Sequence, residues 1–232
     1  MEIKVIASGS AGNCYQISDG VTSLLLDAGV RFADVQKALD FNTRAVRGCL
    51  VSHIHSDHAK AAKEMASRGI YVYSTRETAI ALDCRARVIK PMRIIGIDTL
   101  NVLAFDVVHD EPCVGFQIDS LSTGERLLYI TDAGALKYKF KGITHLLLET
   151  NHSIDILNQR VKAKLLSRNL AQRIADNHMS IERAEKYLLE GYIDTSKIEK
   201  ICLIHMSNDN SNAADFVSRV QKLVPQAEVV AW

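Results

Sequence analysis

The chain has 232 residues, of which 47% are hydrophobic and 24% charged, enough for the core of one large domain or two small ones and unlike a disordered protein. Its formal net charge of +1 excludes a uniformly basic surface, so a polyanionic partner would have to bind a local patch. Five scattered cysteines without a CxxC pair, and the lack of a long apolar run, predict a soluble cytoplasmic protein without disulfides or a membrane partner.

The first half of the chain predicts strands that lead into helices. Short β-rich runs are separated by turn formers, and amphipathic stretches follow them. Thr75 is expected to be the N-cap of the last helix in this half. The expected strands lie at 2–7, 13–18, 21–27, 48–51 and 71–73, and the expected helices at 32–39, 59–67 and 75–82.

The second half repeats this scheme, which predicts strands inside and helices outside in both halves. We therefore expect one domain over residues 1–232, of the α/β class, with two pseudo-duplicate halves. The expected strands of the second half lie at 99–108, 113–119, 126–131, 144–148, 201–204 and 228–230, and the expected helices at 156–176, 181–189 and 213–223.

The segment SHIHSDH at 52–58 follows the apolar strand at 48–51 and contains His53, His55, Asp57 and His58. Histidine nitrogen and aspartate oxygen bind Zn²⁺ at about 2.0–2.2 Å, and a short loop can direct alternate side chains to two neighbouring ions. Packing alone does not explain so many metal-ligand residues in one loop. The segment therefore predicts the centre of a metal-dependent hydrolase.

Three further residues, His109, Asp132 and His205, each follow a predicted strand at a turn. Taken singly, a polar residue at a strand end is more often structural. Together with the loop at 52–58 they make five histidines and two aspartates, too many ligands for one tetrahedral ion. Because strand ends are rigid positions for ligands, the set predicts a centre with two ions that share a carboxylate.

These motifs, in this order, resemble the metallo-β-lactamase superfamily, which implies an αββα sandwich with a di-zinc site at its edge. Further segments resemble the YycJ/WalJ group of that superfamily, which is similar to DNA exonucleases, and the resemblance spans nearly the whole chain. The intervals between His109, Asp132 and His205 leave no room for the long arm of tRNA-processing relatives or for a β-CASP insertion. The segments that resemble the group are SGSAGNCY at 8–15, HDEPCVGF at 109–116, ETNH at 149–152, NHMS at 177–180 and LIHMS at 203–207.

The resemblance also implies roles for individual residues. One ion would be held by His53, His55 and His109, the other by Asp57, His58 and His205, with Asp132 between them. Two divalent ions, Zn²⁺ or Mn²⁺, would share a hydroxide as nucleophile, because coordination lowers the pKa of water to about 7. Asp57 would accept a proton during attack, and His178 would be a general acid or an oxyanion donor.

Three functions remain open from the sequence. The first is a metal-dependent phosphodiesterase that acts on DNA as an exonuclease; the second is a small-molecule hydrolase for a cyclic phosphodiester, lactone or thioester; the third is a metal-binding module without turnover. A basic segment favours a polyanionic substrate, although a solvated helix face explains it equally well. Its residues are Lys137, Lys139, Lys141, Arg160, Lys162, Lys164, Arg168 and Arg173.

Three polar residues near the predicted centre have weaker assignments. Glu149 and His152 either support the metal ligands from behind or belong to the ordinary surface. His145 is expected to be a surface or capping histidine.

Overall fold

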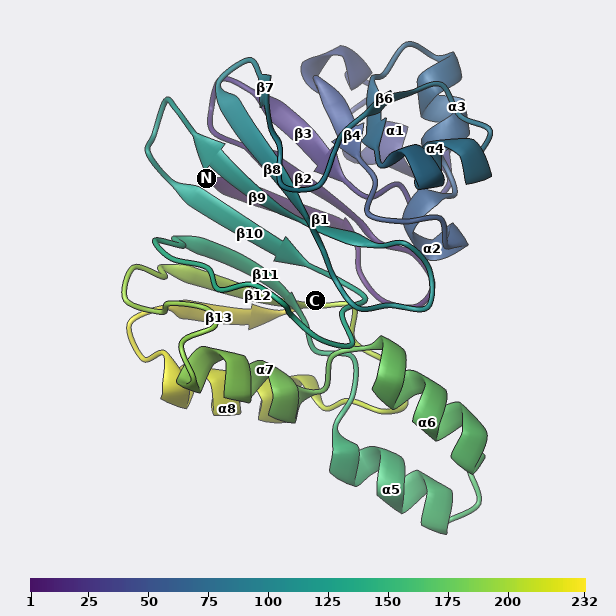
Figure 1. The fold of residues 1–232 in the computed structure, drawn as a ribbon, viewed down its shortest axis with the longest axis vertical. Coiled ribbons are helices and arrows are strands. Elements are labelled where there is room, and N and C mark those ends of the chain that lie inside the picture. Colours follow the sequence, from purple (N-terminus) through teal and green to yellow (C-terminus); the bar gives the residue numbers. More distant parts are fainter. The chain divides into compact units, whose positions relative to one another are not determined.

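The structure is a computed structural model that describes residues 1–232, and these residues form two compact units. Unit 1 comprises Met1–Asp106 and Glu111–Glu125, and unit 2 comprises Val107–Asp110 and Arg126–Trp232. Figure 1 labels the helices and strands of both units. The expectation of a single domain over the whole chain stays a prediction.

Unit 1 contains a six-stranded sheet whose strands follow one another in chain order. Pairing is antiparallel from β1 to β3 and parallel from β3 to β6, so the carboxyl ends of β3 and β4 lie at the same edge. The strands are β1 (Glu2–Ala7), β2 (Cys14–Ser18), β3 (Ser23–Leu26), β4 (Gly48–Leu50), β5 (Val72–Ser74) and β6 (Ala86–Val88). The helices of this part are α1 (Phe32–Ala38), η1 (Thr43–Ala45), α2 (Ser56–Ala59), α3 (Ala62–Ser67) and α4 (Arg76–Ala81).

The helices of unit 1 bury their apolar residues against the sheet. Phe32 and Val35 of α1 and Met65 of α3 lie in one cluster with Cys49 and Val72 of the strands. The N-cap expected at Thr75 is confirmed, because its hydroxyl accepts a hydrogen bond from the Thr78 backbone amide.

Three more strands of unit 1 form an antiparallel meander: β7 (Ile94–Ile97), β8 (Leu100–Asp106) and β9 (Val114–Ser120). The Asp19 carboxylate in the β2–β3 turn joins the meander to the six-stranded sheet. Its Oδ2 accepts hydrogen bonds from the hydroxyls of Thr99, Ser120 and Ser122 at 2.7–2.8 Å.

Unit 2 is built on four parallel strands in the order β10, β11, β12, β13. Their sequences are nearly continuous apolar runs, as expected of parallel strands that are buried on both faces. The strands are β10 (Arg126–Ile130), β11 (His145–Glu149), β12 (Lys200–Ile204) and β13 (Glu228–Ala231), and the helices are α5 (Ile154–Lys162), α6 (Arg168–Asn177), α7 (Ile181–Leu189) and α8 (Ala213–Leu223).

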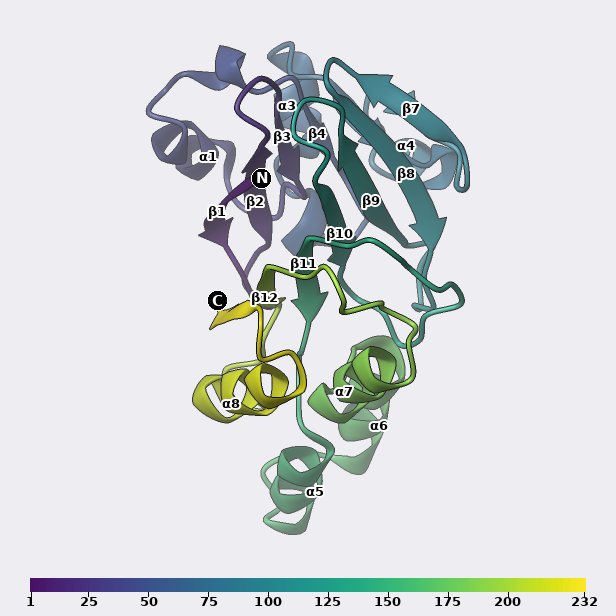
Figure 2. The same ribbon diagram turned by 90° about the vertical axis from the view of Figure 1, so that its left-hand side faces the viewer.

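Helices α7 and α8 pack near the strands of unit 2, whereas α5 and α6 form a hairpin that extends beyond them (Figure 2). The helical stretch expected at 156–176 is thus two helices, and Ser167 caps the second through the Leu170 backbone amide. His145 lies buried within β11, so its assignment to the surface was wrong. No helix of the structure combines the length and apolarity needed to cross a bilayer.

Candidate metal centre

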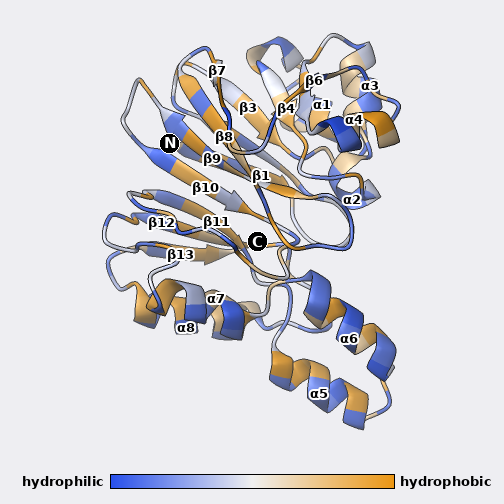
Figure 3. Ribbon diagram, viewed as in Figure 1, coloured by the Kyte–Doolittle hydropathy of each residue, from blue (hydrophilic) through white to orange (hydrophobic).

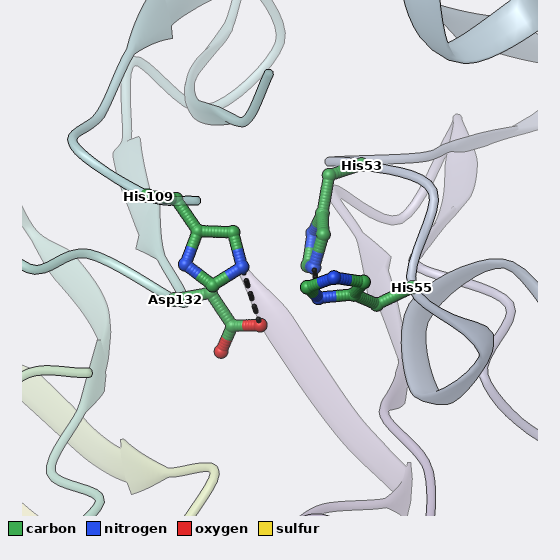
Figure 4. A group of neighbouring side chains, drawn as sticks. All are labelled: His53, His55, His109 and Asp132. Atoms are coloured by element: carbon green, nitrogen blue, oxygen red, sulfur yellow. Dashed lines mark hydrogen bonds and ion pairs between the residues drawn. The ribbon is translucent and has the colours of Figure 1, made fainter. Parts of the chain in front are cut away.

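The loop after β4 brings two histidine nitrogens of unit 1 close together. The Nε2 of His53 lies 3.1 Å from the Nδ1 of His55, and His53 is fully buried (Figure 4). The Nδ1 of His53 is engaged by the Ser52 hydroxyl at 3.0 Å, which leaves Nε2 as its ligand atom. Two ligands at about 2.1 Å from a tetrahedral ion are about 3.4 Å apart, so the pair fits one ion.

Asp27 orients a third imidazole of the same loop. Its Oδ2 lies 2.7 Å from the Nδ1 of His58, and its Oδ1 accepts the Ser52 backbone amide at 2.7 Å. Both Asp27 and His58 are fully buried. This contact presents the Nε2 of His58 to the Asp57 carboxylate, 3.4 Å away.

The backbone around the loop at 52–58 is held by the opening segment of the chain. The Asn13 backbone amide donates to the Asp57 carbonyl oxygen at 2.7 Å, and that of Ala28 to the His58 carbonyl oxygen at 2.7 Å. A Cβ at Gly29 would lie 1.7 Å from the Asp57 carbonyl oxygen, so this position requires glycine. Neither Asn13 nor Asp27 was given a role from the sequence, although Asp27 ends an apolar strand as Asp132 does.

In unit 2 the carboxyl ends of adjacent parallel strands gather ligand residues. The side chains of Asp132, Glu149, His178 and His205 each offer an atom within 4.8 Å of the others. Asp132 follows β10 and His205 follows β12, and both have a left-handed backbone, with φ of 45° and 54°. Such values are rare outside glycine and are concentrated at functional sites.

Glu149 contacts both histidines of this cluster. Its fully buried carboxylate accepts hydrogen bonds from the Nδ1 of His178 at 2.7 Å and of His205 at 3.0 Å, and from the backbone amides of Ala133 and Met179. Burial raises the pKa of Glu149, but the charge of His178 and the hydrogen bonds outweigh it and lower that pKa to about 2. Because the Nδ1 of His205 faces Glu149, its Nε2 is left as the ligand atom.

His178 lies at the border of the cluster, with 24% of its side chain exposed. Its Nδ1 is 3.3 Å from Asp132, and its ring stacks on His205 with centroids 5.3 Å apart. Burial lowers the pKa of His178, but Glu149 and Asp132 together raise it to about 10. In the metal-free protein the imidazole is therefore protonated at neutral pH.

His109 approaches Asp132 from the loop after β8. Its Nε2 lies 3.8 Å from the Asp132 carboxylate (Figure 4) and 3.0 Å from that of Asp110. The Asn177 carbonyl oxygen, 3.2 Å from Nδ1, accepts the Nδ1 proton, so Nε2 is the nitrogen that could bind an ion. The separation is close to that of two ligands on one ion.

Unit 1 thus holds His53, His55, Asp57 and His58 together, and unit 2 holds His109, Asp132 and His205 together. In both units, imidazoles with one nitrogen engaged and carboxylates beside them make a donor set that fits divalent metal ions. That the two sets share a pair of ions stays a prediction. Glu149 contacts metal-ligand candidates directly, whereas His152 is buried, so neither belongs to the surface.

Comparison with known proteins agrees with this chemistry. The model of the family "Anti-Pycsar protein Apyc1" matches residues 7–92. The chain is 27% identical to the exodeoxyribonuclease YycJ of Bacillus anthracis, over 91% of this chain and 84% of that protein. It is 23% identical to the exodeoxyribonuclease WalJ of Streptococcus pneumoniae serotype 2, over 89% of this chain and 82% of that protein.

Solved structures show the fold. The metallo-β-lactamase fold protein YhfI of Bacillus subtilis matches with a TM-score of 0.73 at 15% identity, over 99% of this chain and 95% of YhfI. A diphosphatase of the PhnP family matches with a TM-score of 0.67 at 12% identity, over 99% of this chain and 94% of that one. The expected fold class is confirmed, because the chain has the metallo-β-lactamase fold. Its sequence resembles the YycJ and WalJ exodeoxyribonucleases, and with its groups of metal-ligand side chains it is a metal-dependent hydrolase.

Proposed function

We propose that this hydrolase is a two-metal phosphodiesterase that acts on DNA as an exonuclease. The observation that carries the proposal is the cluster of buried carboxylates and oriented imidazoles at the strand ends of unit 2. The choice of a DNA substrate is supported by the similarity to YycJ and WalJ over about nine tenths of the chain.

The resemblance to the metallo-β-lactamase superfamily suggests how the ligands would be divided. His53, His55 and His109 would hold one ion, Asp57, His58 and His205 would hold the other, and Asp132 would serve both. Each imidazole whose second nitrogen is engaged would keep its ligand nitrogen fixed before an ion arrives. Preorganised ligands of this kind raise metal affinity.

When bound, two such ions would lower the pKa of a water molecule to about 7 and neutralise charge on a phosphoryl transition state. Asp57 would accept the proton that the attacking water loses, since a carboxylate beside that water can take its proton. His178 donates its proton to the departing oxygen or a hydrogen bond to a phosphoryl oxygen. Glu149 is a positioning residue that keeps His178 and His205 in place.

The proposal is tested by hydrolysis. The purified protein, with its metal content measured, is incubated with end-labelled single- and double-stranded DNA and with bis(p-nitrophenyl) phosphate. Release of mononucleotides that requires metal, and that His178→Ala lowers without lowering metal content, is the expected result. Cleavage of the ester but not of DNA would instead favour a small-molecule hydrolase, and bound metal without any turnover would favour a binding module.

A further inference from the structure

The helical hairpin of unit 2, formed by α5 and α6, buries far fewer of its residues than the neighbouring helix does. Among the residues of α7 four are buried, whereas α5 buries Leu157 alone and α6 buries no residue. Ile154 and Leu170 are about half exposed, at 47% and 48%. An amphipathic helix usually buries its apolar stripe, so the hairpin presents apolar surface that nothing in unit 2 covers.

Part of this surface, which includes Ile154 but not Leu170, is a groove between the two helices. It has a volume of about 530 Å³, and its floor is apolar. In Figure 3, hydrophobic residues lie among hydrophilic ones on both helices. The floor consists of Ile154, Leu157, Val161, Ala171 and Ala175.

The charged residues that line the groove, Lys162 and Arg168, are both positive, and no acidic residue lines it. Its neutral polar residues are Asn158 and Gln172. Lys162 and Arg168 form no ion pair, and neither does the neighbouring Lys164.

Other basic residues of the hairpin are already paired. Arg160 lies 3.4 Å from Asp209, and Arg173 lies 3.5 Å from Asp110. The positive charge that is not already paired therefore lies at the tip of the hairpin, where α5 ends at Lys162 and α6 begins at Arg168.

The hairpin is also attached to metal-ligand residues of unit 2. Its last residue, Asn177, accepts the His109 imidazole through its carbonyl oxygen, and His178 follows directly. The Asp176 carbonyl oxygen packs on Gly134, where a Cβ would lie only 2.0 Å away. A ligand held by the hairpin is thus held by the segment that ends at His178 and that contacts His109 through a hydrogen bond.

We propose that the α5–α6 groove binds a single strand of nucleic acid and delivers it to the hydrolytic centre, an inference that rests on the proposed function. A single strand exposes both apolar base faces and phosphates, which suit the floor and the tip of the groove, whereas a duplex hides its base faces. Each helix is about 14–15 Å long, which spans about four nucleotides at a spacing of roughly 3.4 Å.

The charges argue against a second copy of the chain as the occupant. A symmetric dimer contact places the same patch on both subunits, so the unpaired cations of Lys162 and Arg168 would meet a second groove that has cations and no acidic residue. Repulsion of that kind opposes association. Phosphates, by contrast, are neutralised by these cations with release of counterions.

The test compares two charge reversals of equal size in the metal-loaded protein. K162E/R168E changes the groove, and K197E/K222E changes two exposed lysines of unit 2 that form no ion pair and lie outside it. Binding of a fluorescent single-stranded oligonucleotide with phosphorothioate linkages, which resist hydrolysis, is measured by anisotropy over a range of salt. The kcat/KM for bis(p-nitrophenyl) phosphate, the metal content and the mass in solution are measured alongside.

K162E/R168E is expected to weaken oligonucleotide binding at least about tenfold. The slope of the logarithm of the binding constant against the logarithm of the salt concentration should become less steep by about 1.4, or about 0.7 for each phosphate that is no longer neutralised. The control is expected to bind as the native protein does, and both variants should hydrolyse the small ester normally. A native protein that does not bind the oligonucleotide, or a groove variant that binds it as well as the control, would overturn the inference. The inference would also be overturned if the native protein were a dimer in solution and K162E/R168E, but not the control, were a monomer.

Failure of the proposed function has a different signature. In that case the native protein would not hydrolyse DNA, whether or not it hydrolyses the small ester. If it degrades DNA and the groove variant does so equally fast, the phosphodiesterase stands and the groove assignment falls.

Discussion

The Oε1 of Glu149 lies 2.7 Å from the Nδ1 of His178, and the carboxylate is fully buried. The contact joins the end of β11 to the residue that follows α6, 29 positions later in the chain. Since the same oxygen receives the Nδ1 of His205 at 3.0 Å, one buried charge fixes two imidazoles. A single substitution at Glu149 should therefore alter both proton donation and metal binding.

Glu149→Gln keeps the size of the side chain and removes its charge. The pKa of His178 in the metal-free protein should fall from about 10 toward its ordinary value of 6.5, as measured by NMR titration of the imidazole. Because the native pKa is raised, the stability that this pair contributes is fully present below about pH 6.5 and is lost as the pH rises through about 10. An unchanged titration of His178 would contradict the contact.

Asp27→Asn removes the charge and replaces one of the two acceptor oxygens with an amide that donates, so the contacts with His58 and with the Ser52 backbone amide cannot both be kept. We expect metal affinity to fall about 10- to 100-fold at the ion that His58 binds, because the imidazole loses its fixed tautomer. Metal titration followed by mass spectrometry should then show one tight ion and one weak ion. Asp34→Asn is the control, since Asp34 is partly exposed and pairs only with Arg31 on helix α1. Two ions of unchanged affinity in Asp27→Asn would refute this role.

Gly29→Ala should unfold the loop that carries the histidines. The added Cβ would lie 1.7 Å from the Asp57 carbonyl oxygen, and that backbone is held by Asn13, so the loop has to move. We expect a loss of more than about 3 kcal/mol in the free energy of unfolding, measured with urea. Gly96→Ala is the matched control, because its nearest neighbour is an Asn101 side-chain oxygen at 3.7 Å. Equal stability of the two variants would show that the loop tolerates a side chain.

Asp19→Asn should make the stability of the protein less sensitive to acid. Burial raises the pKa of Asp19, but the Thr22 amide and the hydroxyls of Thr99, Ser122 and Ser120 lower it well below its ordinary value of 3.8. A depressed carboxyl pKa contributes stability that is present above about pH 4 and lost as the pH falls further. The variant should be less stable by about 2 kcal/mol at pH 7, and this difference should shrink toward pH 3. A constant difference at every pH would exclude the charge as its cause.

Much of the fold and of the candidate centre was predictable from the sequence because the relevant patterns are local. The apolar runs that became β10, β11 and β12 are continuous, and each ends at a polar residue. Strands β6 and β7 were missed, since they are short and partly exposed and show no clear alternation of apolar and polar residues. His145 was misplaced because a histidine inside an apolar strand reads as a surface residue.

The identity and order of the candidate ligand residues are properties of the sequence alone, because a loop such as 52–58 carries its donor atoms within a few residues. Which nitrogen of each imidazole is the ligand atom is a property of the tertiary structure. His58 is oriented by Asp27, 31 positions away, and His205 by Glu149, 56 positions away. No local pattern contains such pairs, because only the alignment of parallel strand ends brings a buried carboxylate to the ring that it orients.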